Sequence, residues 1–170
     1  MTRLQEAAYG AQWAAALPSS DLGRARLASS EDLTSIDRCA AYLHDVRTSA
    51  WFAAAYGAHA STPVLVGSRQ GVSTTDRERR VIRIGTEDRA DARRCEHACL
   101  HELAHLVTSD RAADGSSREP ARGDQSSRGH HHAWRANFVF IVRMTLGAPA
   151  AARLREEFNA WGLPTLSSAS

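Results

Sequence analysis

The fold and the chemistry of the chain are decided by CLHELAHLV, residues 99–107. This stretch contains HExxH, in which two histidines stand four residues apart and a glutamate follows the first. On an α-helix each residue turns by about 100°, so His101 and His105 lie about 40° apart on one face, one turn from each other. Both imidazoles can then reach one metal ion. We therefore predict a helix from about Asp91 to Val107 that carries a metal site.

Glu102 stands next to the first histidine and can reach a metal-bound water without binding the metal itself. Two histidine ligands with a glutamate as general base form the zinc-hydrolase arrangement. Leu100, Leu103 and Val107 supply an apolar stripe that would bury the helix. The alternative is an amphipathic helix whose histidines only face solvent.

A catalytic zinc ion needs a third protein ligand and an open position for water. The metzincin spacing requires a histidine at position 111, which is Arg111, so that class is excluded. Glutamates are a second source, with Glu119 in a Pro/Gly/Ser-rich segment and Glu156 and Glu157 near the end of the sequence. The histidine triplet at 130–132 is the better source because it directly precedes a predicted helix.

The periodicity of that helix, predicted over about 131–146, selects one member of the triplet. Its apolar stripe comprises Trp134, Phe138, Ile141, Val142 and Thr145. His130 stands one turn before Trp134 and therefore on the same inward face of the helix. By the same spacing His131 and His132 correspond to positions on the outward face. We predict His130 as the third ligand; the alternative is that it only leads into the helix.

The other histidines receive less specific roles. His131 and His132 are expected to face the cleft or solvent, where either can supply the charge that stabilises an oxyanion. His97 precedes His101 by one turn and is interpreted as a surface residue or as a neighbour of the metal ligands.

Cys39, Cys95 and Cys99 are the three cysteines of the chain. They are too few for a disulfide framework, which indicates a reducing, cytoplasmic setting. Cys95 and Cys99 stand four residues apart and can in principle bind metal. Without another cysteine pair, buried inert thiols are our interpretation.

The remaining pattern predicts an α+β domain, mostly helical with a small sheet. Helices are expected at 2–17, 31–47 (with Ser30 as its cap), 51–57 and 150–161, strands at 63–66 and 80–84, and a long flexible loop at 109–129. A chain of 170 residues fits a single domain, 1–170.

Composition excludes several classes. The chain is 43% hydrophobic and 24% charged, and its net charge is only +2. Arginine and acidic residues alternate, as in 76–80, rather than forming the basic stripe of a nucleic-acid binder. The first twenty residues are too polar for a signal peptide, and no segment has the roughly 18 apolar residues of a membrane span.

These residues make the chain resemble a family of small predicted zinc metallohydrolases of GC-rich bacteria and their phages, over nearly its whole length. The matching features are Tyr9, Trp51-Phe52, Tyr56-Gly57, HELAH at 101–105, His130 with Trp134, Gly147 and the tail 151–163. More distantly, HExxH followed by a histidine with an aromatic residue four positions on is similar to SprT-like zinc peptidases. That resemblance implies a minimal zincin-like domain, in which a small sheet and an HExxH active-site helix are joined by a helix that delivers the third ligand. In SprT-like peptidases this histidine is usually followed by glycine, whereas here it is followed by His131.

We therefore expect a Zn²⁺-dependent hydrolase, of the metallopeptidase kind, that acts on a peptide or protein. His101, His105 and His130 would hold the metal and Glu102 would be the general base. An upstream strand would pair with the extended substrate. One alternative is a non-catalytic, zinc-stabilised binding protein. The other is a SprT-like DNA-associated peptidase, against which the weak charge bias argues. The oligomeric state is not predicted.

Overall fold

The computed structural model of the chain describes residues 3–16, 33–108, 130–163 and 165. This part comprises seven α-helices, one short 3-10 helix and a three-stranded sheet. The predicted α+β class, mostly helical with a small sheet, is confirmed. The flexible loop predicted at 109–129 lies outside the described residues.

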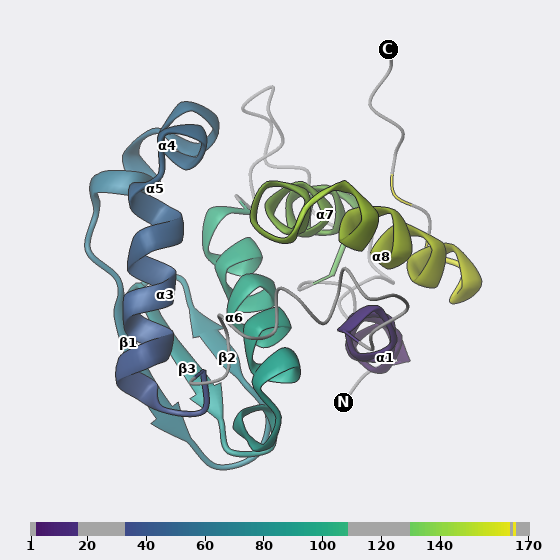
Figure 1. Cartoon of the computed structure of the whole chain (residues 1–170), viewed down its shortest axis with the longest axis horizontal. Coiled ribbons are helices and arrows are strands. Elements are labelled where there is room, and N and C mark those ends of the chain that lie inside the picture. Colours follow the sequence, from purple (N-terminus) through teal and green to yellow (C-terminus); the bar gives the residue numbers. More distant parts are fainter. Residues whose placement is uncertain (1–2, 17–32, 109–129, 164, 166–170) are drawn as a thin grey trace, which may run out of the picture.

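Figure 1 shows the order of the elements along the chain. They are α1 (Arg3–Ala16), α3 (Ile36–Thr48), α4 (Ala50–Tyr56), α5 (Ala58–Ser61), β1 (Leu65–Arg69), β2 (Thr74–Asp76), β3 (Val81–Gly85), the 3-10 helix η1 (Asp88–Ala90), α6 (Ala92–Val107), α7 (His132–Leu146) and α8 (Ala148–Ala160). Within this described part of the chain, every helix is too short or too polar to span a membrane.

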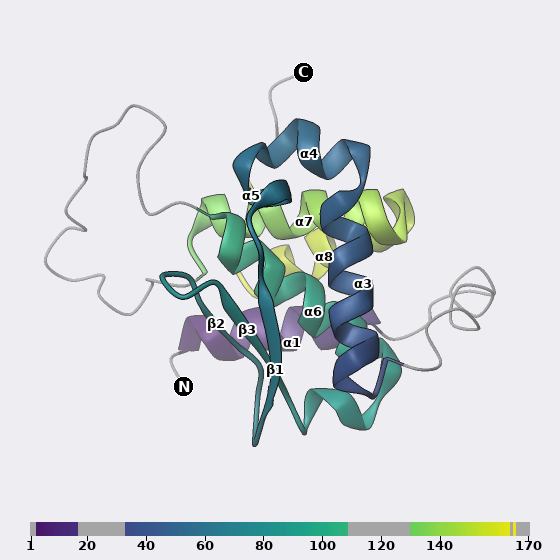
Figure 2. The same cartoon turned by 90° about the vertical axis from the view of Figure 1, so that its left-hand side faces the viewer.

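Helix α6 lies at the centre of the molecule. Helix α3 and the sheet pack on one side of it, and α1 and α7 pack on the other, with α8 against both of these (Figures 1 and 2). The helix begins after Asp91, whose carboxylate accepts hydrogen bonds from the backbone N–H groups of Arg93 and Arg94 and caps the first turn. All residues from 97 to 104 are buried. The predicted HExxH sequence therefore lies on a helix that has almost no solvent face there.

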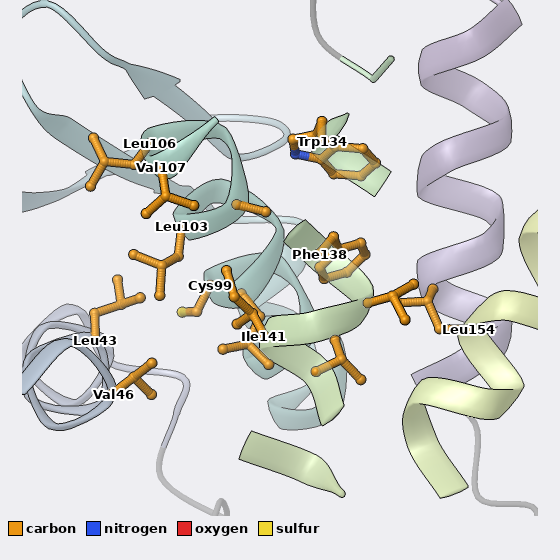
Figure 3. Packing of buried hydrophobic residues seen from close by; sticks show 14 of the residues in the cluster. Leu43, Val46, Cys99, Leu103, Leu106, Val107, Trp134, Phe138, Ile141 and Leu154 are labelled. Carbon is orange, nitrogen blue, oxygen red and sulfur yellow. The ribbon is translucent and has the colours of Figure 1, made fainter. Parts of the chain in front are cut away.

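The core forms on both sides of α6. Figure 3 shows Leu43 and Val46 of α3 approaching α6 from one side, and Trp134 and Phe138 of α7 lying on the other. Leu103 is fully buried among these groups. The apolar stripes of α6 and α7 predicted from the sequence therefore meet in one core, which fixes the position of the central helix.

The sheet has the strand order β1-β3-β2, with β1 parallel and β2 antiparallel to β3. Strands predicted at 63–66 and 80–84 correspond to β1 and β3, shifted toward the C-terminus. β2 was not predicted, because a three-residue strand of Thr-Thr-Asp has no apolar alternation. Gly85 is required where β3 ends, since a Cβ there would lie 2.0 Å from the carbonyl oxygen of Gly71.

The predicted start of one helix is wrong. Helix α3 begins after Ser35, whose hydroxyl oxygen accepts a hydrogen bond from the backbone N–H of Arg38, and not after Ser30. The short helix α5 was not predicted. Helix α7 ends at Gly147, as expected, and this glycine has a φ of 97°, in the region that favours residues without a Cβ.

Replacing Leu103 by alanine should lower the free energy of unfolding by about 2–5 kcal/mol, because the substitution leaves a cavity beside α6. The matched control is Leu65→Ala, since the Leu65 side chain is 67% exposed and should cost about 0.5 kcal/mol or less. Chemical denaturation followed by circular dichroism measures both. Equal losses in the two variants would contradict the placement of α6 at the centre of the core.

Candidate metal centre

Three histidine side chains converge beside α6. His101 and His105 project from this helix, one turn apart, and His130 lies just before α7. Their Nε2 atoms are separated by 3.2 Å (101 to 105), 3.1 Å (105 to 130) and 3.0 Å (101 to 130). The structure thus brings the three histidines selected from the sequence to one point, although 29 residues separate the first from the last.

This group has the donor set and the spacing that a metal ion needs. A neutral imidazole has one N–H and one lone pair, so three Nε2 atoms facing one point cannot all satisfy each other. A circle through nitrogens so spaced has a radius of about 1.8 Å, shorter than a Zn–N bond of about 2.0–2.1 Å. The three nitrogens are therefore close enough together for all of them to bind one zinc ion, and a set of three protein ligands would leave a position for water. The residues fit the ion.

The imidazoles are neutral near pH 7. Burial, reinforced by the neighbouring histidines, lowers the pKa of His101 and of His105 well below the ordinary value. Burial and the charge of Arg135 lower the pKa of His130 to about 4. Only the neutral ring offers a lone pair to a metal, so this environment favours metal binding over protonation.

Aromatic packing orients the three rings. The indole of Trp134 contacts all of them, with centroid distances of 4.6 Å to His101, 5.0 Å to His105 and 4.3 Å to His130. Tyr9 of α1 stacks on His101 at 4.7 Å. Metal-binding histidines usually donate their second N–H to an acceptor. Here the Nδ1 atoms of His101 and His130 are buried without a hydrogen-bond partner among the described residues, so packing fixes these two rings.

His130 joins the other two histidines from a position just before α7, the helix whose periodicity was used to infer its direction. Helix α7 begins at His132, and His131 is its N-cap. The carbonyl oxygen of His130 accepts a hydrogen bond of 2.7 Å from the Arg135 guanidinium, which holds the preceding residue against the first turn. The predicted helix of about 131–146 agrees with α7 to within one residue, and His130 is buried, as the inward direction inferred from Trp134 requires. Its role as a metal ligand stays a prediction.

Glu102 lies beside the three histidines, with Oε1 3.9 Å from Nε2 of His101. The residue is 1% exposed. Thr75 of β2 donates a hydrogen bond of 2.8 Å to Oε2, and Tyr9 donates one of 3.4 Å to Oε1. Burial raises the pKa of Glu102 to about 8, against the effect of these two hydroxyls. A cation held by the histidines would favour the ionised carboxylate, because opposite charges stabilise each other at this range.

A buried polar chain continues from Glu102 into the sheet. The hydroxyl of Tyr9 also lies 3.2 Å from the carbonyl oxygen of Ser73. The N–H of Ser73 and its hydroxyl both donate to Oδ2 of Asp88, which is fully buried. α1, β2 and η1 are thereby tied to the carboxylate on α6.

Tyr9 and Thr75 were missed as site residues by the reasoning from local pattern. Tyr9 entered only as a feature of the family resemblance, and Thr75 lies in the unpredicted strand. A signal was present in both cases: a tyrosine in an Ala-rich helix, and a β-branched pair after Ser73. Neither signal indicates which distant residue it will contact.

The remaining predicted histidines lie apart from the three Nε2 atoms. His97 is buried and not a surface residue, and burial lowers its pKa to about 4. Its interpretation as a neighbour of the metal ligands stays a prediction. His131 is half-buried and His132 is exposed. An oxyanion-stabilising role for either stays a prediction.

Comparison of the chain with protein-family models, curated proteins and solved structures finds no match.

Replacing His130 by alanine should weaken metal binding by at least about 100-fold, because one of three converging nitrogens is removed. His132→Ala is the matched control and should bind as the wild type does, since its ring is exposed. Cobalt(II) titration, followed by the visible bands of a nitrogen-ligated ion, measures both affinities. Loss of these bands in His132→Ala but not in His130→Ala would move the third ligand to a different member of the triplet.

Proposed function

We propose that the chain is a zinc-dependent hydrolase, and more narrowly a peptidase with a minimal zincin-like fold. One observation carries the proposal: the Nε2 atoms of His101, His105 and His130 meet within 3.2 Å of one another, with the carboxylate of Glu102 beside them. Three neutral nitrogen donors with a neighbouring carboxylate match the requirements of metal-assisted hydrolysis.

A zinc ion in this place would supply Lewis-acid activation of water and of the substrate carbonyl. Glu102 would take one proton from the attacking water. The water oxygen forms a bond to the carbonyl carbon, the C–N bond breaks, and Glu102 passes the proton to the departing amine. The products are a carboxylic acid and an amine. Thr75 and Tyr9 would hold the carboxylate in one orientation throughout.

The sheet supports a peptide as substrate. Within the described residues β2 pairs only with β3, so its second edge has no strand beside it. The same strand contacts α6, and the hydroxyl of Thr75 lies 2.9 Å from the backbone carbonyl of Glu102. An extended peptide added along this edge would lie next to the three histidines, bound through backbone hydrogen bonds.

A purely structural zinc site is less consistent with the arrangement. Structural zinc sites usually have four protein ligands, whereas the group formed by the described residues has three. A buried carboxylate that does not belong to the ligand set has no role in a structural site, and its burial is unfavourable. A catalytic site uses both features.

The state of the cysteines supports the cytoplasm as the compartment. All three are free and buried, including the pair whose sulfurs are 3.4 Å apart. Free thiols at such a distance are typical of proteins kept in a reducing environment.

Glu102→Gln should retain the metal and lower peptide hydrolysis by about 100-fold or more, because the amide cannot accept the proton. The substrate probe is a proteome-derived peptide library incubated with the zinc-loaded protein, with new termini detected by mass spectrometry. Hydrolysis by the variant at the wild-type rate would refute the mechanism. A zinc-loaded wild type that cleaves no member of the library would refute the peptidase assignment.

Thr75→Val should lower kcat by up to about 10-fold with little change in KM, because it removes one hydrogen bond that positions Glu102. Thr75→Ser keeps the hydroxyl and should restore most of the rate. Steady-state kinetics on the best peptide from the library measures both variants. If Ser and Val are equally impaired, the methyl group of Thr75 matters through packing and its hydroxyl does not position the carboxylate.

A further inference from the structure

The strongest cluster outside the histidine site is formed by Cys39, Cys95 and Cys99. We propose that these three thiols bind a soft, sulfur-seeking cation such as Zn²⁺ or Cu⁺ as a second metal site, separate from the three histidines. This site would join α3 to α6. The proposal is independent of the hydrolase function.

The geometry brings together all the cysteines of the chain. Cys39 comes from α3 and the other two from consecutive turns of α6, yet their sulfurs all lie within 4.8 Å of one another. The sulfurs of Cys39 and Cys95 are 3.4 Å apart. Around an ion with Zn–S bonds of about 2.3 Å, the sulfurs would be about 3.8–4.0 Å apart. The sulfur separations, from 3.4 Å to at most 4.8 Å, therefore include the value expected around one ion bound by three sulfurs.

Two of the three cysteines stand at helix N-termini, where the helix dipole favours a thiolate. Cys39 is the fourth residue of α3 and Cys95 is the fourth residue of α6, so both sulfurs lie in a first helical turn, near the positive end of the helix dipole. Hydrogen bonds among the three thiols lower the pKa of Cys39 and raise the pKa of Cys95 and of Cys99, so in the metal-free cluster one sulfur holds its proton least tightly and a bound cation has to displace the protons of the other two.

Arg89 can also balance the charge of the bound state. Three thiolates around a divalent cation leave one negative charge, which is costly in an apolar core unless a cation compensates it. The Nε atom of Arg89 is buried and has no hydrogen-bond partner among the described residues. This guanidinium is the group whose charge acts on Cys39.

Sulfur ligands select the class of ion. Thiolates favour Zn²⁺, Cu⁺ and similar soft ions over Mg²⁺ or Ca²⁺, whereas imidazoles also accept harder transition metals. All three cysteines are 0% exposed. We therefore expect the ion to enter during folding rather than by diffusion into the folded chain.

The test uses cobalt(II), whose bonds to sulfur give a near-ultraviolet charge-transfer band that bonds to histidine do not. The full chain is refolded in a thiol-free reductant with cobalt(II), and folding is checked by circular dichroism. We expect the band in the wild type and in the double variant His101→Ala/His105→Ala. Cys39→Ser, which conserves size, should lose most of it. Zinc analysis of protein expressed in zinc-rich medium should give about two ions per chain in the wild type and one in the histidine variant.

Two results would overturn the proposal. One is a folded wild type that shows no charge-transfer band and binds only one zinc ion, which would make the three thiols inert core residues. The other is a band of equal intensity in Cys39→Ser. The first result is read from the wild type alone, and the histidine variant repeats it, so a Cys39→Ser chain that fails to fold still leaves the proposal testable. Neither depends on hydrolysis, and the loss of activity in Glu102→Gln is a separate test.

Discussion

A helix that is buried around its whole circumference must satisfy its polar side chains within the protein, and α6 is such a helix from residue 97 to 104. It carries two imidazoles and a carboxylate, and the carboxylate is among the most costly groups to bury. The neighbouring elements meet part of this demand, since the Nδ1 atom of His101 has no partner among the described residues. β2 supplies the hydroxyl of Thr75, α1 supplies that of Tyr9, and the segment before α7 brings a third imidazole. A cation among the imidazoles would compensate the carboxylate.

The site is rigid because its orientation comes from packed rings. Trp134 contacts all three imidazoles, and Tyr9 stacks on one of them while its hydroxyl reaches Glu102. Side chains locked by packing lose little freedom when an ion or a substrate binds, so the binding free energy is not spent on ordering them. The aromatic core and the polar site are therefore one structure, with the indole of Trp134 belonging to both.

The periodicity of the sequence predicted correctly those features that depend on the geometry of one helix. The spacing of His101 and His105 follows from 3.6 residues per turn, and the stripe that includes Trp134 indicated the direction of His130. Periodicity cannot show which distant segments meet. Thr75 contacts a residue 27 positions away and Tyr9 one 93 positions away, and nothing in the sequence around either one indicates its partner. The start of α3 was misplaced because Ser30 and Ser35 offer the same capping chemistry.

The cysteine cluster and the histidine cluster both include residues of α6, but they lie on different faces of this helix. Helix α6 contributes two residues, four positions apart, to each cluster. The histidine pair follows the cysteine pair by six positions, which is about 120° around the helix axis and about 9 Å along it. The cysteines therefore face α3, and the histidines face α1 and the start of α7. An ion on the cysteines would tie down the first turns of α3 and α6, whereas an ion on the histidines would tie α6 to α7.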